Sequence, residues 1–366
     1  MKIPLIKPYI TQAVKDKVCQ VLDSGYLTEG PVTKAFEQSV KDYIGCGHVI
    51  AVTNCTNGLE LALRALNIGP GDEVIIPDYT YPATGSAVEI AGAKISIVDV
   101  SSSSMLIDYD ALEAAVTPQT KAVMPVSIFG NPLYWDRLNQ IKQKHNLYMI
   151  EDAACSLGAS YKDGKVGTQA DISVFSLHPR KFITTGEGGL VTTDNDEWAD
   201  WMISYKHFGM GVCDTRLSTS FERIGTNYKL SNLASAVGLA QMDQVDTLLQ
   251  RRQTLAHRYY DRFASVPGIE IPQITAGARH SFQSCCIFVK NRDALMASLA
   301  AKGIQTQIGT YSLHMHNAFA RNPNCSISGP MTGSRYAFDH CLTLPLYHDM
   351  TEEEQDFVIT EVSRHS

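Results

Sequence analysis

The sequence predicts an α/β protein with a large, mostly parallel β-sheet covered on both faces by helices, joined to a smaller C-terminal α/β unit. Between residues 48 and 193, short apolar runs typical of strands alternate with amphipathic helical segments, a pattern that favours parallel strands with crossover helices. From about residue 260 the predicted elements become shorter. We therefore place a large domain over residues 1–245 and a small domain over residues 246–366.

The individual elements follow from apolar spacing and turn residues in chain order. Residues 230–260 carry a repeating apolar face that predicts one long helix linking the domains. The C-terminal helix has Thr351 as its N-cap and Glu354 in the capping-box position. The other predicted helices are 9–24, 32–43, 59–66, 84–91, 108–116 and 133–144, and the predicted strands are 48–52, 73–77, 94–98, 122–126, 147–150, 172–177, 190–193, 286–289 and around 305–309.

The composition excludes several classes of protein. With 366 residues, 44% hydrophobic and 19% charged, the chain has the composition of a globular protein. A net charge of −7 disfavours nucleic acid or an anionic membrane as a partner. No apolar run reaches membrane-spanning length, and the first residues lack a signal-peptide core. Nine cysteines without a CxxC pattern indicate reduced thiols in a cytoplasmic protein, and no metal site is expected.

The most informative stretch is 171–193, DISVFSLHPRKFITTGEGGLVTT. An apolar strand breaks at His178-Pro179-Arg180-Lys181, and a glycine corner at residues 186–189 leads into a second strand. A lysine at the end of a strand beside such a corner can hold an amine in a pocket. Taken alone, however, a solvated lysine next to a glycine hairpin is the more common arrangement.

Other residues that carry chemistry follow neighbouring strands, and ligands bind at the carboxyl ends of such strands. A pyridoxal phosphate enzyme needs a lysine, a carboxylate for the ring nitrogen, hydroxyls and amides for the phosphate, and an aromatic face. Asp152 alone would be a helix cap and Tyr81 alone a core aromatic, but their co-occurrence favours the cofactor site. There is no GxGxxG after a strand and no P-loop. The strand-end set is Thr56, Tyr81, Asp152, Ser176 and Lys181.

Longer motifs resemble a known family. The stretches HPRKFITTGEGG, EDAACSLGASYKDGKVG, GTNYKLSNLASAVGLAQMDQVD, SGYLTEGP and LPLYHDMTEEE are similar to those of the DegT/DnrJ/EryC1/StrS sugar aminotransferases. The resemblance runs from Lys7 nearly to the C-terminus. It implies fold type I (the aspartate aminotransferase fold), pyridoxal phosphate in the large domain, and a homodimer with shared active sites.

The resemblance also implies roles for matched positions. Lys181 would form the Schiff base with the cofactor and Asp152 would hold the pyridine nitrogen, both being catalytic. Tyr81 would stack on the ring, Thr56 and Ser176 would bind the phosphate, and Asn227 would reach the phosphate of the neighbouring subunit. Three positions depart from the family: Cys55 stands where Gly is usual, Cys155 where Gln or His is common near the ring hydroxyl, and Lys229 where Arg is more usual. The expected substrate-binding residues are Thr28, Tyr311 and His314, although a structural role for the histidine is equally open.

The expected reaction is amino transfer from glutamate to a nucleotide-linked keto-deoxysugar, for cell-surface glycan or secondary-metabolite synthesis. Because TTGEGG resembles members that act at C4, whereas C3 members more often carry GDGG, we expect C4. Amination at C3, a keto-inositol substrate, sugar dehydration and a non-catalytic binding role are the alternatives. Dehydratases of the family replace the lysine by histidine, and Lys181 is present here. As a proton carrier, Lys181 needs a pKa lowered by burial and the cofactor.

Overall fold

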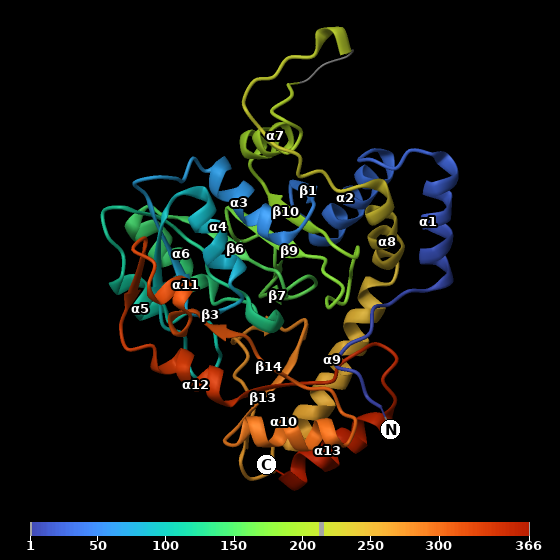
Figure 1. The fold of residues 1–366 in the computed structure, drawn as a ribbon, viewed down its shortest axis with the longest axis vertical. Coiled ribbons are helices and arrows are strands. Elements are labelled where there is room, and N and C mark those ends of the chain that lie inside the picture. Colours follow the sequence, from blue (N-terminus) through green and yellow to red (C-terminus); the bar gives the residue numbers. More distant parts are fainter. Residues whose placement is uncertain (1, 212–215, 366) are drawn as a thin grey trace.

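The structure, a computed structural model, describes residues 2–211 and 216–365. Its centre is an eight-stranded sheet of order β1-β10-β9-β6-β5-β2-β4-β16 (Figure 1). Every strand runs in the same direction except β10, which is antiparallel to both neighbours. The strands are β1 (His48–Val52), β2 (Glu73–Pro77), β4 (Lys94–Val98), β5 (Thr120–Val123), β6 (Tyr148–Asp152), β9 (Ile172–Ser176), β10 (Gly189–Thr193) and β16 (Cys325–Ser328).

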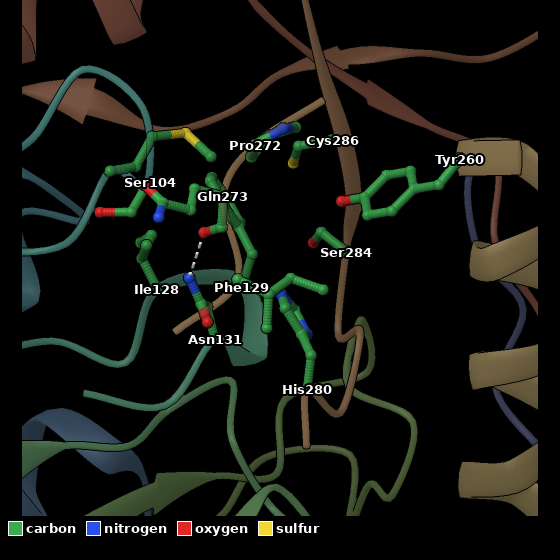
Figure 2. A pocket seen from close by; sticks show the side chains of 12 residues that line it. Ser104, Ile128, Phe129, Asn131, Tyr260, Pro272, Gln273, His280, Ser284 and Cys286 are labelled. Atoms are coloured by element: carbon green, nitrogen blue, oxygen red, sulfur yellow. Dashed lines mark hydrogen bonds between the residues drawn. The ribbon is translucent and has the colours of Figure 1, made fainter. Parts of the chain in front are cut away.

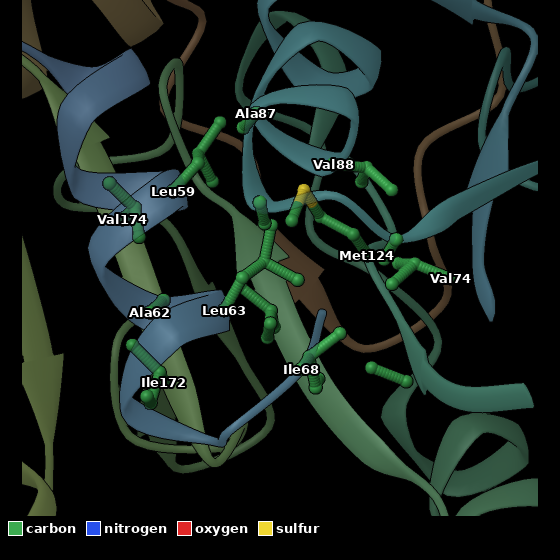
Figure 3. Close-up of a cluster of buried hydrophobic side chains, with 14 of the residues drawn as sticks. Leu59, Ala62, Leu63, Ile68, Val74, Ala87, Val88, Met124, Ile172 and Val174 are labelled. Atoms are coloured by element: carbon green, nitrogen blue, oxygen red, sulfur yellow. The ribbon is translucent and has the colours of Figure 1, made fainter. Parts of the chain in front are cut away.

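Helices cover both faces of this sheet because successive strand residues point to opposite sides. Ile76 packs in the cluster formed by α3, α4 and α7, whereas Ile75 packs in the cluster formed by α5 and α6. Figure 3 shows the first cluster, in which Leu63 lies near Val74 and Met124. The helices are α3 (Cys55–Ala65), α4 (Ala83–Ala91), α5 (Tyr109–Ala114), α6 (Trp135–His145) and α7 (Asp196–Tyr205).

A further cluster joins the N-terminal helices to the sheet near β9 and β10. Phe36 and Val40, on one side of α2, pack with Phe175 and Leu190. A helix with one apolar stripe buries that stripe against the sheet. The helices of this region are α1 (Gln12–Ser24), capped by Thr11, α2 (Pro31–Ile44) and α8 (Asn232–Met242).

The smaller unit is an antiparallel four-stranded sheet, β11-β13-β17-β14, with its own core. The N-terminal Ile3 forms a bridge to Ile304 and lies in that core. In contrast, β15 and β16 return to the large unit, so the boundary at 245/246 stays a prediction. The elements are α9 (Val245–Phe263), β11 (Ile269–Glu270), β13 (Cys285–Val289), α10 (Arg292–Ala301), β14 (Gln307–Ile308), β17 (Cys341–Leu344) and α13 (Glu352–His365).

The remaining elements are short and connect these units. In the described part of the chain, no helix is both long and apolar enough to span a membrane. The connecting elements are β3 (Tyr79–Thr80), β15 (Tyr311–Ser312), β7 (Ser160–Tyr161), β8 (Gly164–Lys165), β12 (Ala278–Arg279), α11 (Asn317–Ala320), α12 (Thr332–His340), and the 3-10 turns η1 (Ile128–Gly130), η2 (Arg216–Ser218) and η3 (Leu313–Met315).

The predicted fold class is confirmed, but the single helix over residues 230–260 is wrong. Ser231 caps α8, and the chain breaks at Asp243 and Gln244 before α9 begins. The apolar periodicity continues across this break, which is why the sequence pattern did not show it. The predicted capping box of α13 is confirmed: Thr351 N–H donates to Glu354 at 2.9 Å and Glu354 N–H to the Thr351 hydroxyl at 3.1 Å.

We predict that Gly238→Ala lowers the thermal stability of the protein. Alanine normally favours a helix interior over glycine by about 1 kcal/mol. At Gly238, in α8, a Cβ would lie 2.6 Å from Cζ of the buried Phe36 ring, so the ring must move. We expect thermal unfolding to show a lower Tm, with part of the loss recovered by Phe36→Leu/Gly238→Ala. A rise in Tm for the single variant would contradict the close contact.

Candidate active site

The predicted carboxylate lies at the carboxyl edge of the large sheet. Asp152 is the last residue of β6 and only 4% of it is exposed. Its backbone N–H donates to Pro125 O at 3.0 Å, and its carbonyl accepts from Ser127 N–H at 3.1 Å. In the side chain, Oδ2 accepts from the Thr84 hydroxyl at 2.7 Å and Oδ1 from Ala154 N–H at 3.2 Å. Burial raises the pKa of Asp152, and these two donors together with Lys181 oppose the shift only in part.

Lys181 lies in the turn between β9 and β10, and its position is fixed by the backbone. Its N–H donates to His178 O at 2.8 Å. Two glutamine side chains clamp the same turn. The amide oxygen of Gln283 accepts from Phe182 N–H at 3.1 Å, and that of Gln241 accepts from Thr184 N–H at 3.1 Å. The sequence analysis did not identify these two glutamines, because Gln241 lies in α8 and Gln283 just before β13, both far from Lys181 along the chain.

The amine of Lys181 contacts the thiol that departs from the family pattern. The Lys181 Nζ–Cys155 Sγ distance is 3.1 Å. Burial lowers the pKa of Lys181, but Cys155, Cys55 and Asp152 more than offset burial, so the pKa lies above its ordinary value. Burial acts in the expected direction, but the protein groups together raise the pKa of Lys181, so the lowering that proton transfer needs stays a prediction for the site with its cofactor. Cys155 is thus placed to interact directly with the amine.

The start of α3 has the geometry of an anion site. Asn54 caps the helix by accepting from Asn57 N–H at 2.8 Å. The next two residues, Cys55 and Thr56, lie in the first turn, where backbone amides have no partner inside the helix. Cys55 is not among the described residues with positive φ, so the usual glycine is not required there. The adjacent Gly189 permits close approach, because a Cβ would lie 2.7 Å from Asn54 C.

Ser176 and Tyr81 also lie at this edge of the sheet. Ser176 ends β9 and is half-buried, and its Oγ accepts from His178 N–H at 3.4 Å. Tyr81 follows β3 and is 65% exposed. Its ring centroid lies 6.2 Å from that of Tyr311. Thus the predicted aromatic and one predicted substrate residue are neighbours.

His314 belongs to a buried polar network that the sequence did not reveal. Its Nδ1 lies 2.5 Å from Asp78 Oδ2, and its N–H donates to Asp78 Oδ1 at 2.7 Å. The hydroxyl of Ser334 also donates to Asp78, which is completely buried. The carboxylate therefore fixes the orientation of the imidazole. Both the structural role and the substrate role remain compatible with this geometry.

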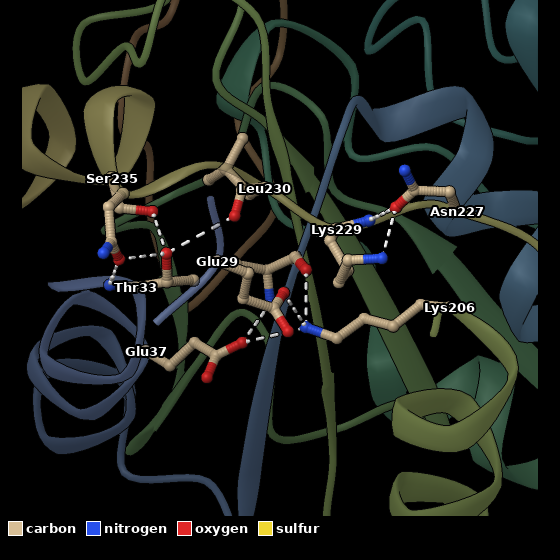
Figure 4. A network of polar contacts seen from close by, with 10 residues as sticks. Glu29, Thr33, Glu37, Lys206, Asn227, Lys229, Leu230 and Ser235 are labelled. Atoms are coloured by element: carbon tan, nitrogen blue, oxygen red, sulfur yellow. Dashed lines mark hydrogen bonds and ion pairs between the residues drawn. The ribbon is translucent and has the colours of Figure 1, made fainter. Parts of the chain in front are cut away.

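Two predicted residues lie apart from this cluster. Thr28 is exposed, and its carbonyl accepts from Asn232 N–H at 3.2 Å. Asn227 accepts from Lys229 Nζ at 2.7 Å (Figure 4). In the described residues, no hydrogen bond links Thr28 or Asn227 to Lys181. Figure 4 also shows the buried Lys206, whose Nζ donates to Oε2 of Glu29 at 2.7 Å. This contact fixes the connection between α1 and α2, in which Thr28 lies.

The small cavity in Figure 2 is a different feature. It lies beside η1 and is lined by Phe129, Tyr260 and His280 among others. Its volume of about 10 Å³ holds a single water at most. The eight described cysteines are free, and Cys213 lies outside the described residues. Among the described residues, no group of three or more His, Cys, Asp or Glu could hold a metal ion.

The donor set fits one cofactor. An amine on a fixed turn, a buried carboxylate, and a helix N-terminus with nearby hydroxyls meet at the carboxyl edge of one sheet. On a fold of this kind they define a pyridoxal phosphate enzyme.

Comparison with known proteins agrees. The model of the DegT/DnrJ/EryC1/StrS aminotransferase family matches residues 8–363. GDP-perosamine synthase of Caulobacter vibrioides is 32% identical over 378 residues, covering 99% of this chain and 98% of that protein. The spore coat polysaccharide biosynthesis protein SpsC of Bacillus subtilis is 32% identical over 374 residues, covering 98% and 96%. The PLP form of Spr1654 from Streptococcus pneumoniae superposes with a TM-score of 0.92 at 29% identity, covering 100% and 98%.

The chain belongs to the DegT/DnrJ/EryC1/StrS aminotransferase family. It is a sugar aminotransferase of fold type I, and its cofactor is pyridoxal phosphate.

Glu151, on the opposite face of β6, generates a pH prediction. The residue is completely buried and accepts from Ser173 Oγ at 3.3 Å. Burial raises its pKa from an ordinary value of 4.5 to about 7. Between pH 4.5 and pH 7 the unfolded chain has released this proton while the folded protein retains it, so this group lowers the free energy of unfolding as pH rises across that interval, and the loss levels off above pH 7. Glu151→Gln removes the effect, and its stability advantage over the parent should grow by roughly 3 kcal/mol across that range.

Urea unfolding at several pH values measures this advantage. Glu197→Gln, at an exposed glutamate of α7, is the matched control. A constant difference between Glu151→Gln and the parent from pH 4.5 to pH 8 would refute the assignment to Glu151.

Proposed function

We propose that this enzyme transfers the amino group of glutamate to C4 of a nucleotide-linked keto-deoxysugar. The observation that carries the proposal is the Lys181 amine, held on a rigid turn at the same sheet edge as Asp152 and the start of α3. When bound, the cofactor supplies an electron sink for bond breaking at the amine-bearing carbon. The keto sugar would then receive the nitrogen in a second half-reaction at the same site.

The chain's own residues would divide the work as follows. Lys181 would hold the cofactor covalently and, once released by the amino donor, carry the proton as general base and acid. Asp152 would pair with the pyridine nitrogen. The first turn of α3, with Thr56, and Ser176 would bind the phosphate. Cys155, 3.1 Å from Lys181 Nζ, would hold the released amine near the reacting carbon.

The choice of sugar rests on likeness. GDP-perosamine synthase, by its name, makes a nucleotide-linked amino sugar, and it is 32% identical to this chain. The TTGEGG corner favours C4. Tyr311 beside Tyr81, and His314 held by Asp78, would contact the sugar. SpsC acts in spore coat polysaccharide biosynthesis, which is consistent with a cell-surface glycan product.

Exposed apolar side chains support the proposed homodimer with shared sites. Phe208 is 50% exposed, Phe221 63% and Ile224 97%, all on the segment that leads from α7 to Asn227. The described parts of this segment, residues 206–211 and 216–226, project from the body beyond α7 (Figure 1). Exposed apolar groups gathered on one segment mark interaction sites. In a dimer, the segment would bring Asn227 to the site of the partner.

We predict that Lys181→Ala lowers the rate of amino transfer by about 10²–10⁴-fold, because the variant loses its proton carrier. It should also lose the yellow, borohydride-sensitive absorbance of the bound cofactor. Lys144→Ala, at an exposed lysine of α6, is the matched control and should retain both properties. Parental amination by Lys181→Ala would show that the lysine is misassigned.

The substrate is identified by incubating the purified protein with glutamate and a panel of acceptors while oxoglutarate release is followed. The panel comprises 4-keto-6-deoxy and 3-keto hexoses linked to UDP, GDP or dTDP, and keto-inositols. We expect turnover of a 4-keto-6-deoxy sugar. Preferential turnover of a 3-keto sugar or a keto-inositol would overturn the C4 proposal, and sugar dehydration without oxoglutarate would overturn amino transfer.

A further inference from the structure

We propose that Thr80 and Thr84 form a hydrogen-bond relay that positions the Asp152 carboxylate and keeps it ionised for the pyridine nitrogen of the cofactor. The inference rests on the proposed role of Asp152 and extends it to two positioning residues. Neither threonine was identified from the sequence motifs. Both come from the corner YTYPAT, in which only Tyr81 was predicted to act.

The direction of the relay follows from counting hydrogens. The hydroxyl of Thr84 donates to Asp152 Oδ2 at 2.7 Å, and the hydroxyls of Thr80 and Thr84 lie 2.8 Å apart. A threonine hydroxyl has one hydrogen to give. Since Thr84 gives its hydrogen to the carboxylate, Thr80 must be the donor to Thr84. The order is therefore Thr80 to Thr84 to Asp152, and it ends on an acceptor.

Burial makes this relay consequential. Thr84 is completely buried, Thr80 is 1% exposed and Asp152 is 4% exposed, so water cannot replace a missing donor easily. A buried carboxylate is costly unless it is paired and hydrogen-bonded. Polarisation of the Thr84 hydroxyl by Thr80 strengthens the bond to the carboxylate. The relay thus stabilises the charged form, which is the form that can pair with a protonated ring nitrogen.

The charged and titratable groups around Asp152 make the relay necessary. Lys181 favours the charged carboxylate, whereas Glu151 and Cys55 interact with it unfavourably when they ionise. Burial raises the pKa of Asp152, and Thr84 opposes this more than either Ala154 N–H or Lys181 does. Loss of the Thr84 hydroxyl therefore removes the largest of the three contributions that keep the carboxylate ionised.

The corner also couples the relay to the ring-stacking position. Thr80 ends β3, whose partner β15 fixes it opposite Tyr311. Thr84 lies in the first turn of α4, and its N–H donates to Tyr81 O at 3.2 Å. Tyr81, between them, points outward and is 65% exposed. Residues 79–84 therefore orient both Tyr81, which would stack on the cofactor ring, and Asp152, which would pair with the pyridine nitrogen.

The test is titration of the full-length apoprotein with pyridoxal phosphate, by absorbance and fluorescence, from pH 5 to pH 9. Thr84→Val should raise the Kd at pH 7 about tenfold, since it removes one hydrogen bond to a charged group. Its acid limb, where binding weakens as Asp152 is protonated, should move up by about one pH unit. Thr80→Val should shift both in the same direction by less. Thr84→Ser should restore the parental values.

Thr192→Val is the matched control. Thr192 is a completely buried threonine in β10 whose hydroxyl donates to Gly167 O at 2.9 Å, away from Asp152. It should lower the Tm without moving the Kd or the acid limb. In an Asp152→Asn background, Thr84→Val should change the Kd by no more than about twofold, because its target is gone.

Several outcomes separate this proposal from the proposed function. A Thr84→Val protein with parental Kd and acid limb would overturn the relay while leaving Asp152 in its role. A loss of affinity that is equally large in the Asp152→Asn background would overturn it as well. Parental affinity in Asp152→Asn itself would overturn the role of Asp152, and the relay with it. Thr80→Val supplies the same comparison should Thr84→Val fail to fold.

Discussion

Burial of the Asp152 carboxylate at the carboxyl edge of the sheet is the constraint on which the site depends. A carboxylate removed from water is costly unless donors and a cation surround it. Thr84 and Ala154 N–H supply the donors, and Lys181 supplies the positive charge. In return, the same low exposure makes any pairing at this carboxylate stronger than it would be in water. The chemistry and the stability of the site therefore rest on one set of contacts.

The position of the lysine depends on both units of the fold. Gln241 from α8 and Gln283 from the approach to β13 hold the backbone of the turn from either side. Gln283 also donates to Arg180 O at 2.7 Å, so the residue before the lysine is tied to the smaller unit. A rigid support of this kind is what proton transfer over short distances requires. Because Gln283 bonds to the backbone on both sides of Lys181, a movement of the smaller unit would displace the lysine turn.

The two cysteines at the site have separate physical explanations. Cys55 is accommodated because it begins α3 with ordinary helical geometry, while the close approach at that point is made possible by Gly189. Cys155 instead contacts the amine of Lys181. Its negative form raises the pKa of that amine, which the protein groups alone do not lower. A lowered pKa of Lys181, which proton transfer requires, therefore depends on the cofactor as well as on the protein groups.

The sequence by itself determined the fold class, the family and the strand ends at which chemistry occurs, because period and motif are local properties that one chain records in order. Lys181 and Asp152 were predicted as site residues in this way, and the predicted capping box of α13 is confirmed. The helix break near Asp243 was not, because apolar spacing continues through it. Only the tertiary structure decided which side chains serve those residues. Thr84, Gln241 and Gln283 reach the site across separations of 57 to 101 residues, and such contacts leave no periodic trace in the sequence.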